Sequence, residues 1–292
     1  MVARHPPRGG RPERASRGPE IRLRGPVASI DVRSPYARLV RAGYLRHSTY
    51  RAAALAGLAT NTVFGLLRVS VLLAVVAAGG AAAGYDAASV STFVWLGQGL
   101  LAVVLLWGDP ELSQRVRNGD VAIDLARPVN LQLTQLAGDL GRAGHAMLWR
   151  FLPPVVFGAL LLPFRWPTSP GTLVLFAVAV VLAVALSSTL RFIVELTSFW
   201  LLDARGVRSL YGAVSGVLAG LTVPLAFFPD TVRAAIYATP FPGLLQTPID
   251  VFSERGPTLA LLGHQVLWLA GATVVAQIAL ARATRKLVVQ GG

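Results

Sequence analysis

The residue types that carry catalysis and metal binding are scarce in this sequence. Cysteine is absent, which excludes thiolate metal sites, cysteine nucleophiles and disulfides. The histidines are scattered and form no His-Glu-x-x-His pair for a metal ion; they are His5, His47, His145 and His264. Ser215 lies in Gly-Ala-Val-Ser-Gly, which lacks the glycine two residues before a serine nucleophile, so we expect Ser215 and His264 to make ordinary polar contacts. We predict no catalytic residue and no metal site.

The sequence also lacks the elements of an ATP-binding site. Lys286 is the single lysine, and no glycine-rich turn lies beside it. A phosphate-binding loop requires that combination. We therefore expect no cofactor on this chain.

Polar and ionisable side chains inside long apolar runs are the remaining candidates for function, and each ionisable one costs a few kcal/mol in a membrane. They are Asn61, Arg68, Gln98, Arg191 and Glu195. Arg191 and Glu195 are four residues apart on one expected helix and can pair there. The pair is either structural or part of a substrate path. Arg68 either reaches the outer interface or joins that path, and Asn61 and Gln98 are expected to hydrogen-bond between helices.

The long connection between two apolar runs contains nearly every signal of a short helix with defined ends. The signals in chain order are the cap Asp109, Pro110 at the first helical position, Glu111 in the first turn, Arg115 and Arg117 in the last turn, and the stop Asn118-Gly119. We expect a helix of about eight residues over 109–118. From the residues alone it is either a rigid docking element or an ordinary capped loop helix.

These segments belong to a chain with the composition of a membrane protein. Its 292 residues are 54% hydrophobic and 14% charged, with a mean hydropathy of +0.58, whereas charged residues make up about 25% of soluble domains. Crossing a bilayer takes about 20 helical residues. Six segments meet that length, at 52–78, 88–107, 145–163, 171–202, 207–228 and 258–282. We predict an all-α membrane protein with six transmembrane helices.

The basic residues give the expected orientation. The net charge is +13, and 12 of the 27 Lys and Arg residues lie in the first 51 positions. With the N-terminus inside, 22 Lys and Arg residues lie in inner segments and three in outer ones, which predicts that both termini are cytoplasmic. Residues 1–33 are expected to form a disordered basic tail, and residues 34–51 an amphipathic helix in the inner interface.

The segment between the last two apolar runs is divided by prolines at positions 229, 240, 242 and 248. Only helices of about 8 to 10 residues fit between them, which is too short to cross a bilayer. We expect short re-entrant or interfacial helices on the outer side, with a plain structured loop as the alternative.

Several of these stretches resemble one family. Residues 117–129 (RNGDVAIDLARPV) are similar to the hallmark between the second and third spans of the permease subunits of bacterial type-2 ABC exporters. Residues 50–67, 199–206 (FWLLDARG), 223–250 and 282–292 resemble the same family. The resemblance covers residues 36–292 and implies a transmembrane domain over 34–292.

The resemblance implies a permease with six spans, an N-terminal elbow helix and no ATPase of its own. Two permease chains, identical or related, would each dock a separate ATP-binding subunit that carries ATP and Mg²⁺. The helix 109–118 would be the coupling helix. The residues implied in coupling are Asp109, Glu111, Arg115, Arg117, Asp120, Asp124 and Arg127.

Together, these features predict a multi-pass permease of the bacterial cytoplasmic membrane that exports a small amphiphilic or cationic compound, as in multidrug or xenobiotic efflux. Membrane lipid is an expected partner, and nucleic acid is not. Two alternatives remain from the sequence. One is an ion-coupled secondary transporter with Glu195 as the carrier, and the other is a scaffold whose basic tail holds anionic lipid or nucleic acid.

Overall fold

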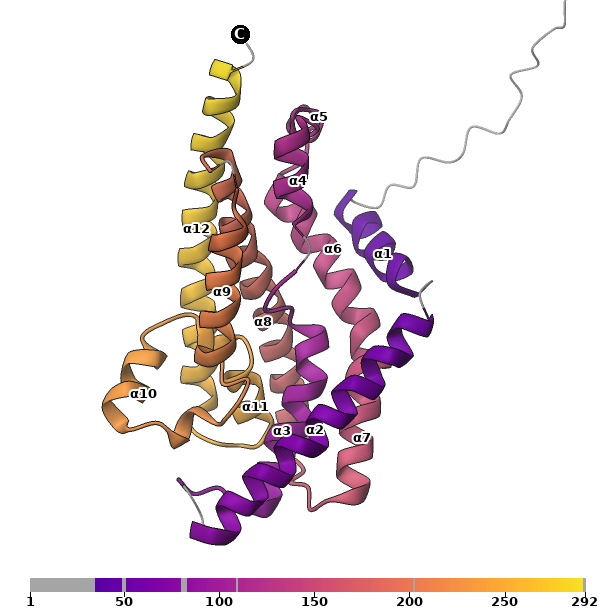
Figure 1. The fold of residues 1–292 in the computed structure, drawn as a ribbon, viewed down its shortest axis with the longest axis vertical. Coiled ribbons are helices and arrows are strands. Elements are labelled where there is room, and N and C mark those ends of the chain that lie inside the picture. Colours follow the sequence, from indigo (N-terminus) through magenta and orange to yellow (C-terminus); the bar gives the residue numbers. More distant parts are fainter. Residues whose placement is uncertain (1–34, 49–50, 80–82, 109, 202, 291–292) are drawn as a thin grey trace, which may run out of the picture. The chain divides into compact units, whose positions relative to one another are not determined.

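The computed structural model describes residues 35–48, 51–79, 83–108, 110–201 and 203–290. The regular elements of these residues are helices (Figure 1). The α-helices are α1 (Pro35–Ser48), α2 (Arg51–Gly79), α3 (Ala87–Val103), α4 (Glu111–Asn118), α5 (Val121–Leu125), α6 (Leu131–Ala146), α7 (Leu152–Leu161), α8 (Pro170–Leu196), α9 (Arg205–Leu218), α10 (Asp230–Tyr237), α11 (Gln246–Phe252) and α12 (Thr258–Gln290). A π turn at Met147–Phe151 and 3-10 turns at Thr197–Phe199, Leu225–Phe227 and Phe241–Gly243 complete the elements. The predicted tail 1–33 and Asp109 lie outside the described residues.

Four helices in the described residues are long and apolar enough to cross a membrane, where six spans were predicted. They are Gly57–Gly79, Leu131–Leu161, Pro170–Phe199 and Thr258–Lys286. Helix α3 has 17 residues because the chain becomes extended at Val104, so it is shorter than the predicted 88–107. The single helix predicted over 207–228 is wrong: α9 has 14 residues, and the chain turns at Gly220, whose φ of 78° favours glycine.

The third predicted span, 145–163, is part of a longer helix. The helix begins at Leu131, where the side chain of Asn130 accepts a hydrogen bond from the Leu133 N–H, and continues to Leu161. Pro153 and Pro154 do not interrupt it, because the π turn Met147–Phe151 comes directly before them. A π turn changes the hydrogen-bond pattern where the prolines supply no N–H donor.

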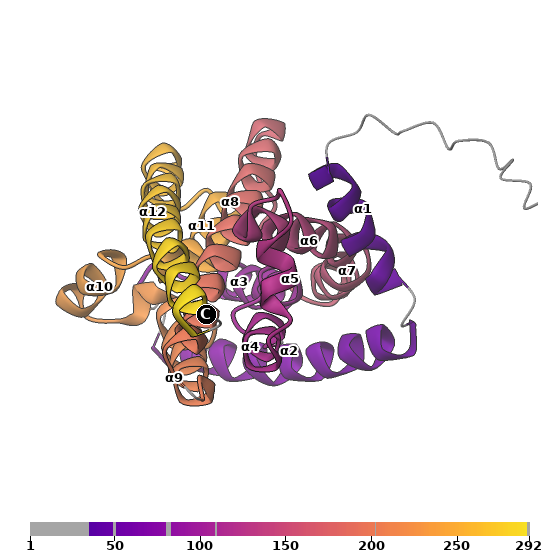
Figure 2. The same cartoon turned by 90° about the horizontal axis from the view of Figure 1, so that it is seen from above.

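Helix α3 lies at the centre of the bundle, among α2, α6, α7 and α8 when viewed from above (Figure 2). Every residue from Ser89 to Leu100 is buried. A glycine allows α7 to pack closely against α3, since a Cβ at Gly158 would overlap the indole ring of Trp95.

The other long helices differ in how much of their surface the chain itself covers. Helix α8 is mostly buried, whereas only 17% of the apolar stretch of α2 or α12 is buried within the chain. Much of the surface of α2 and α12 is therefore left for lipid or another chain.

The helix predicted over 34–51 is present as α1. It packs along α6, backbone against backbone. A Cβ at Gly141 would overlap the carbonyl oxygen of Val40, and a Cβ at Gly43 would overlap that of Gly138. Tyr44 adds an edge-to-face contact with His145 of α6, with ring centroids 5.4 Å apart. Small residues on both helices therefore set the position of α1.

We expect Gly141→Ala to loosen α1 from α6, because the new methyl group has no space and overpacking costs about 1–3 kcal/mol. Trypsin should then cut the arginines of α1 faster in purified protein. Gly138→Ala is the matched control, since its Cβ would meet no atom within 4 Å and alanine favours a helix over glycine. Equal cleavage of the two variants would contradict this packing.

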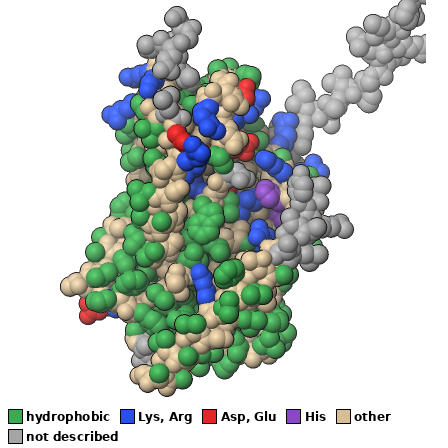
Figure 3. All heavy atoms as spheres, viewed as in Figure 1, with side chains coloured by type: hydrophobic (Ala, Val, Ile, Leu, Met, Phe, Trp, Pro, Cys, Tyr) green, Lys and Arg blue, Asp and Glu red, His purple; other side chains and the backbone are tan. Residues whose placement is uncertain are grey.

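The charged side chains gather at one end of the face shown in Figure 3, around α4, α5 and the nearby part of α12, while hydrophobic side chains cover most of the opposite half. This division matches a chain with one end in water and its body in lipid.

Candidate functional site

Helix α4 has the predicted residues at its C-terminal end, but its N-terminal end differs from the prediction. Arg115 and Arg117 lie in its last turn, and Gly119 ends it with a left-handed φ of 81°. Pro110 is the N-cap residue rather than the first helical residue, and it offers no side-chain cap. The predicted cap Asp109 lies outside the described residues, and among the described residues a cap has to come from another element.

Glu195 of α8 supplies that cap. Its Oε2 accepts a hydrogen bond from the backbone N–H of Ser113 at 2.9 Å and another from the Ser113 hydroxyl. Both residues are buried. Arg208 of α9 lies 4.0 Å from the other carboxylate oxygen and donates to the Ser113 hydroxyl at 3.3 Å. A carboxylate near the first turn satisfies orphan N–H groups and the helix dipole, so α4, α8 and α9 are held together at this point.

The predicted ion pair between Arg191 and Glu195 is wrong. Arg191 donates instead to Asp139 of α6 at 2.6 Å. The four-residue spacing on α8 is compatible with an ion pair between Arg191 and Glu195. In the structure, Glu195 instead contacts Ser113 of α4 and Arg208 of α9.

Asp139 is the centre of a cluster of three charges that the sequence analysis missed. Its second oxygen lies 3.5 Å from Arg142, one turn along α6. Arg142 also donates to the carbonyl oxygens of Ala102 and Val103, at 2.9 and 2.8 Å, at the C-terminal end of α3. The side chains of Asp139, Arg142 and Arg191 are only 11–12% exposed. The three-residue spacing of Asp139 and Arg142 was the available signal, but residues 131–144 were assigned to a connection rather than a helix.

Helix α5 completes a compact unit with α4. Asp124 accepts a hydrogen bond from Arg115, which raises the pKa of the arginine, and lies 3.5 Å from Arg127. Buried Leu112 and Val121 join a hydrophobic cluster with α8 and α12 residues. Arg117 and Asp120 are exposed. The α4–α5 unit is thus anchored on one side and free on the other.

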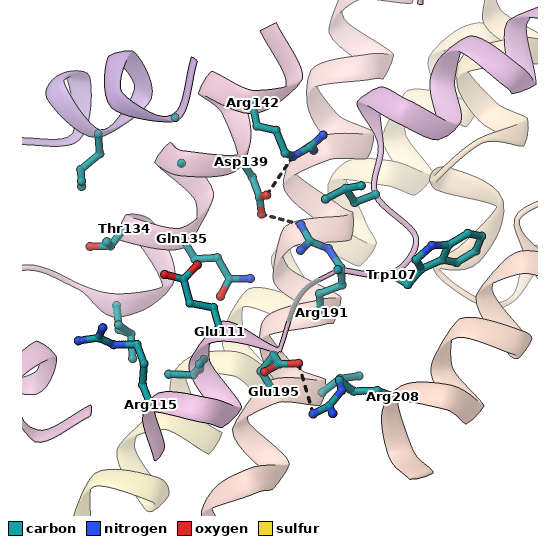
Figure 4. Close-up of a pocket in the computed structure, with 18 of the residues that line it drawn as sticks. Trp107, Glu111, Arg115, Thr134, Gln135, Asp139, Arg142, Arg191, Glu195 and Arg208 are labelled. Carbon is teal, nitrogen blue, oxygen red and sulfur yellow. Dashed lines mark hydrogen bonds and ion pairs between the residues drawn. The ribbon is translucent and has the colours of Figure 1, made fainter. Parts of the chain in front are cut away.

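A cavity of about 990 Å³ lies between this unit and α1, α6, α8 and α9. Figure 4 shows Asp139 between Arg142 and Arg191, and Glu195 facing Arg208, along its wall. Trp107, Thr134 and Gln135 also line it. The cavity therefore joins the predicted coupling residues to the charged residues of α6 and α8.

The other predicted intramembrane residues lie elsewhere. Arg68 of α2 donates to the carbonyl oxygen of Leu221 at 2.8 Å, which ties α2 to the turn after α9. The Asn61 amide lies 3.5 Å from the carbonyl oxygen of Gln98. None of these three lines the cavity. Ser215 and His264 bond separately, to the carbonyl oxygens of Gly212 and Tyr237, so they form no catalytic pair.

The segment between α9 and α12, predicted to lie on the outer side, contains two short helices, α10 and α11, and a buried acid. Asp250 is 7% exposed and accepts hydrogen bonds from Gln246 at 2.8 Å and from the Tyr237 hydroxyl at 3.3 Å. Burial raises the pKa of Asp250 to about 7. The carboxyl group is therefore largely protonated in mildly acidic solution.

This acid predicts a pH dependence of stability. The ordinary pKa of Asp250 is 3.8, and its pKa in the folded protein is about 7. At a pH between these two values, the carboxyl group has lost its proton in the unfolded chain and keeps it in the folded chain. The unfolding free energy should then fall as pH rises, by up to about 1.4 kcal/mol per pH unit, and level off above pH 7. Asp250→Asn should flatten this part of the curve in thermal unfolding across that pH range. Parallel curves for the two proteins would contradict the assignment.

Comparison with known proteins adds one match. The sequence model described as ABC-2 family transporter protein matches residues 61–291. No curated protein matches the chain. The described residues contain no group of three His, Cys, Asp or Glu side chains suited to a metal ion.

Proposed function

Because the chain belongs to the ABC-2 family of transporter membrane proteins, we propose that it is the membrane permease of an ATP-driven exporter. ATP and Mg²⁺ bind to a separate subunit, and this chain converts the motion of that subunit into export of a small amphiphilic compound, as in drug or xenobiotic efflux. A second permease chain, identical or related, completes the transmembrane part.

The observation that carries this proposal is the construction of the α4–α5 unit. A docking helix must transmit force, so it needs a rigid attachment to the membrane helices and a free surface for its partner. Glu195 fixes the first turn of α4 to α8, and Leu112 and Val121 bury the inner side. Arg117, Asp120 and Ile123 remain exposed on the other side.

The proposed arrangement in the membrane uses six passes. The four long helices, together with α3 and α9 as shorter passes, put α4, α5 and both termini on the cytoplasmic side of the bacterial inner membrane. The charged end of the molecule supports this orientation (Figure 3). Residues 34–292 then form the transmembrane domain, with α10 and α11 on the outer side and α1 as the elbow helix.

The test is affinity purification of the full chain from its native membrane in mild detergent. A stoichiometric ATP-binding subunit should copurify, and a second permease chain would identify a heterodimer. Arg117→Glu should reduce the copurified subunit, because Arg117 is exposed in the last turn of α4. Arg165→Glu, in the connection between α7 and α8, is the control. A chain that binds no ATPase even after crosslinking would overturn the proposal.

The contacts of Glu195 do not support the alternative of an ion-coupled transporter. One of its oxygens caps α4 and the other faces Arg208. A carrier would have to break both contacts in every cycle.

A further inference from the structure

Among the described residues that line the cavity beside α6 and α8, six are arginines and four carry carboxylates. Two guanidinium groups, those of Arg142 and Arg191, share the single carboxylate of Asp139, and all three side chains are largely buried. Each of these four described carboxylates lies within 4.0 Å of an arginine; the pairs are Glu111 with Arg46, Asp124 with Arg115, Asp139 with Arg191, and Glu195 with Arg208. A cation entering this cavity meets no described carboxylate that lacks an arginine, whereas an anion gains from the excess charge.

The lining of the cavity also includes two hydrogen-bond donors without an acceptor. The Nε of Arg191 and the hydroxyl of Tyr211 are buried, and neither has a partner among the described residues. Both residues line the cavity. A buried polar group without a partner costs about 1–3 kcal/mol, so an acceptor supplied by a ligand would be favourable at both.

The rest of the lining suits an apolar body. Leu39, Leu105, Leu112 and Val194 line the cavity with Trp107, which is 50% exposed. Its volume of about 990 Å³ falls in the range of small-molecule sites. Charge at one wall and apolar side chains at the others fit an amphiphile.

We propose that this cavity binds an amphiphile by its acidic head group, which Arg191 and Tyr211 hold. The inference rests on the proposed function, because it names the class of compound that the permease takes up. It favours an organic acid over the cationic compound that the sequence suggested.

The test measures binding to the full chain in nanodiscs of phosphatidylcholine, independently of transport and of any ATPase. The probes are octyl phosphate and octyltrimethylammonium, which share one alkyl chain and differ in head-group charge. The wild-type protein should bind octyl phosphate at least about tenfold more tightly, a difference of about 1.4 kcal/mol. Equal binding, or tighter binding of the ammonium compound, would overturn the inference and leave the copurification test of the proposed function unaffected.

Two variants locate the site. Arg191→Gln should abolish the preference, and it leaves Arg142 and Asp139 as a balanced pair, so the protein is expected to fold. Arg205→Gln is its control, because Arg205 is exposed, pairs with Asp203 and does not line the cavity. Tyr211→Phe should weaken octyl phosphate binding while Tyr44→Phe, on α1 outside the cavity, should not. A preference that survives in Arg191→Gln and Tyr211→Phe would overturn the assignment.

The acidic head group can belong to an exported compound or to an anionic phospholipid. Adding phosphatidylglycerol to the nanodiscs separates these sources. Competition with octyl phosphate that disappears in Arg191→Gln identifies a lipid as the occupant, and unchanged octyl phosphate binding identifies a free amphiphile. Either result supports an acid-binding cavity.

Discussion

Asp139→Asn should destabilise the folded protein by about 3–5 kcal/mol, the usual loss when one partner of a buried ion pair is removed. The neutral amide would leave Arg142 and Arg191 together without a carboxylate, and both are only 11–12% exposed. Thermal unfolding and the yield of monodisperse protein in detergent measure this loss.

Two variants show whether charge balance is the cause. Arg191→Gln removes one positive charge and leaves one guanidinium group with one carboxylate, so we expect a smaller loss than for Asp139→Asn. Asp120→Asn changes an exposed acid of the α4–α5 unit and should leave stability unchanged. If Asp139→Asn were as stable as Asp120→Asn, the charge cluster would not stabilise the fold.

Glu195→Ala should weaken the docking of the ATP-binding subunit by about ten- to hundredfold. Hydrogen bonds to a charged group contribute about 1.5–3 kcal/mol, and each 1.4 kcal/mol corresponds to a factor of ten in affinity. Without the carboxylate, the first turn of α4 is no longer fixed to α8, and the partner would have to order the helix as it binds. Titration of the purified permease with its ATP-binding subunit measures the change.

Glu195→Gln should give an intermediate affinity, because its amide oxygen can still accept from the Ser113 N–H. The matched control is Glu254→Ala in the connection before α12. Glu254 accepts hydrogen bonds from the backbone and hydroxyl of Thr168 and from Thr172, so its loss is chemically similar but far along the chain from α4. Equal weakening by both substitutions would indicate general destabilisation rather than loss of the cap.

The sequence predicted the elements whose signals are local. The apolar runs of α2, α8 and α12 are long enough to be identified by composition. Helix α4 was predicted from its end residues, since Gly119 and the basic last turn act within a few positions. The turn at Gly220, which follows the end of α9, was not predicted. A glycine inside an apolar run is compatible with both a helix and a turn.

The candidate site depends on contacts that the sequence does not display. Residues 131–144 were too polar to be identified as part of a membrane helix, yet their polar groups have partners on other helices. Gln132 hydrogen-bonds with Thr189 of α8 and with Gln277 of α12, and Asp139 accepts a hydrogen bond from Arg191 of α8. For the same reason the pairing of Arg191 with Glu195 was wrong: helical spacing identifies possible partners on one helix but not competing ones from a neighbour.

The packing of α1 on α6 has a consequence for the synthesis of the protein. The partner of α1 begins about 100 residues later in the chain, at Leu131. At roughly 5–20 residues per second, the ribosome takes several seconds to produce it. During that interval α1 has no glycine surface to dock on. The amphipathic helix must wait at the membrane surface or on a chaperone, so α1 reaches its final position after α2 and α3 have been made.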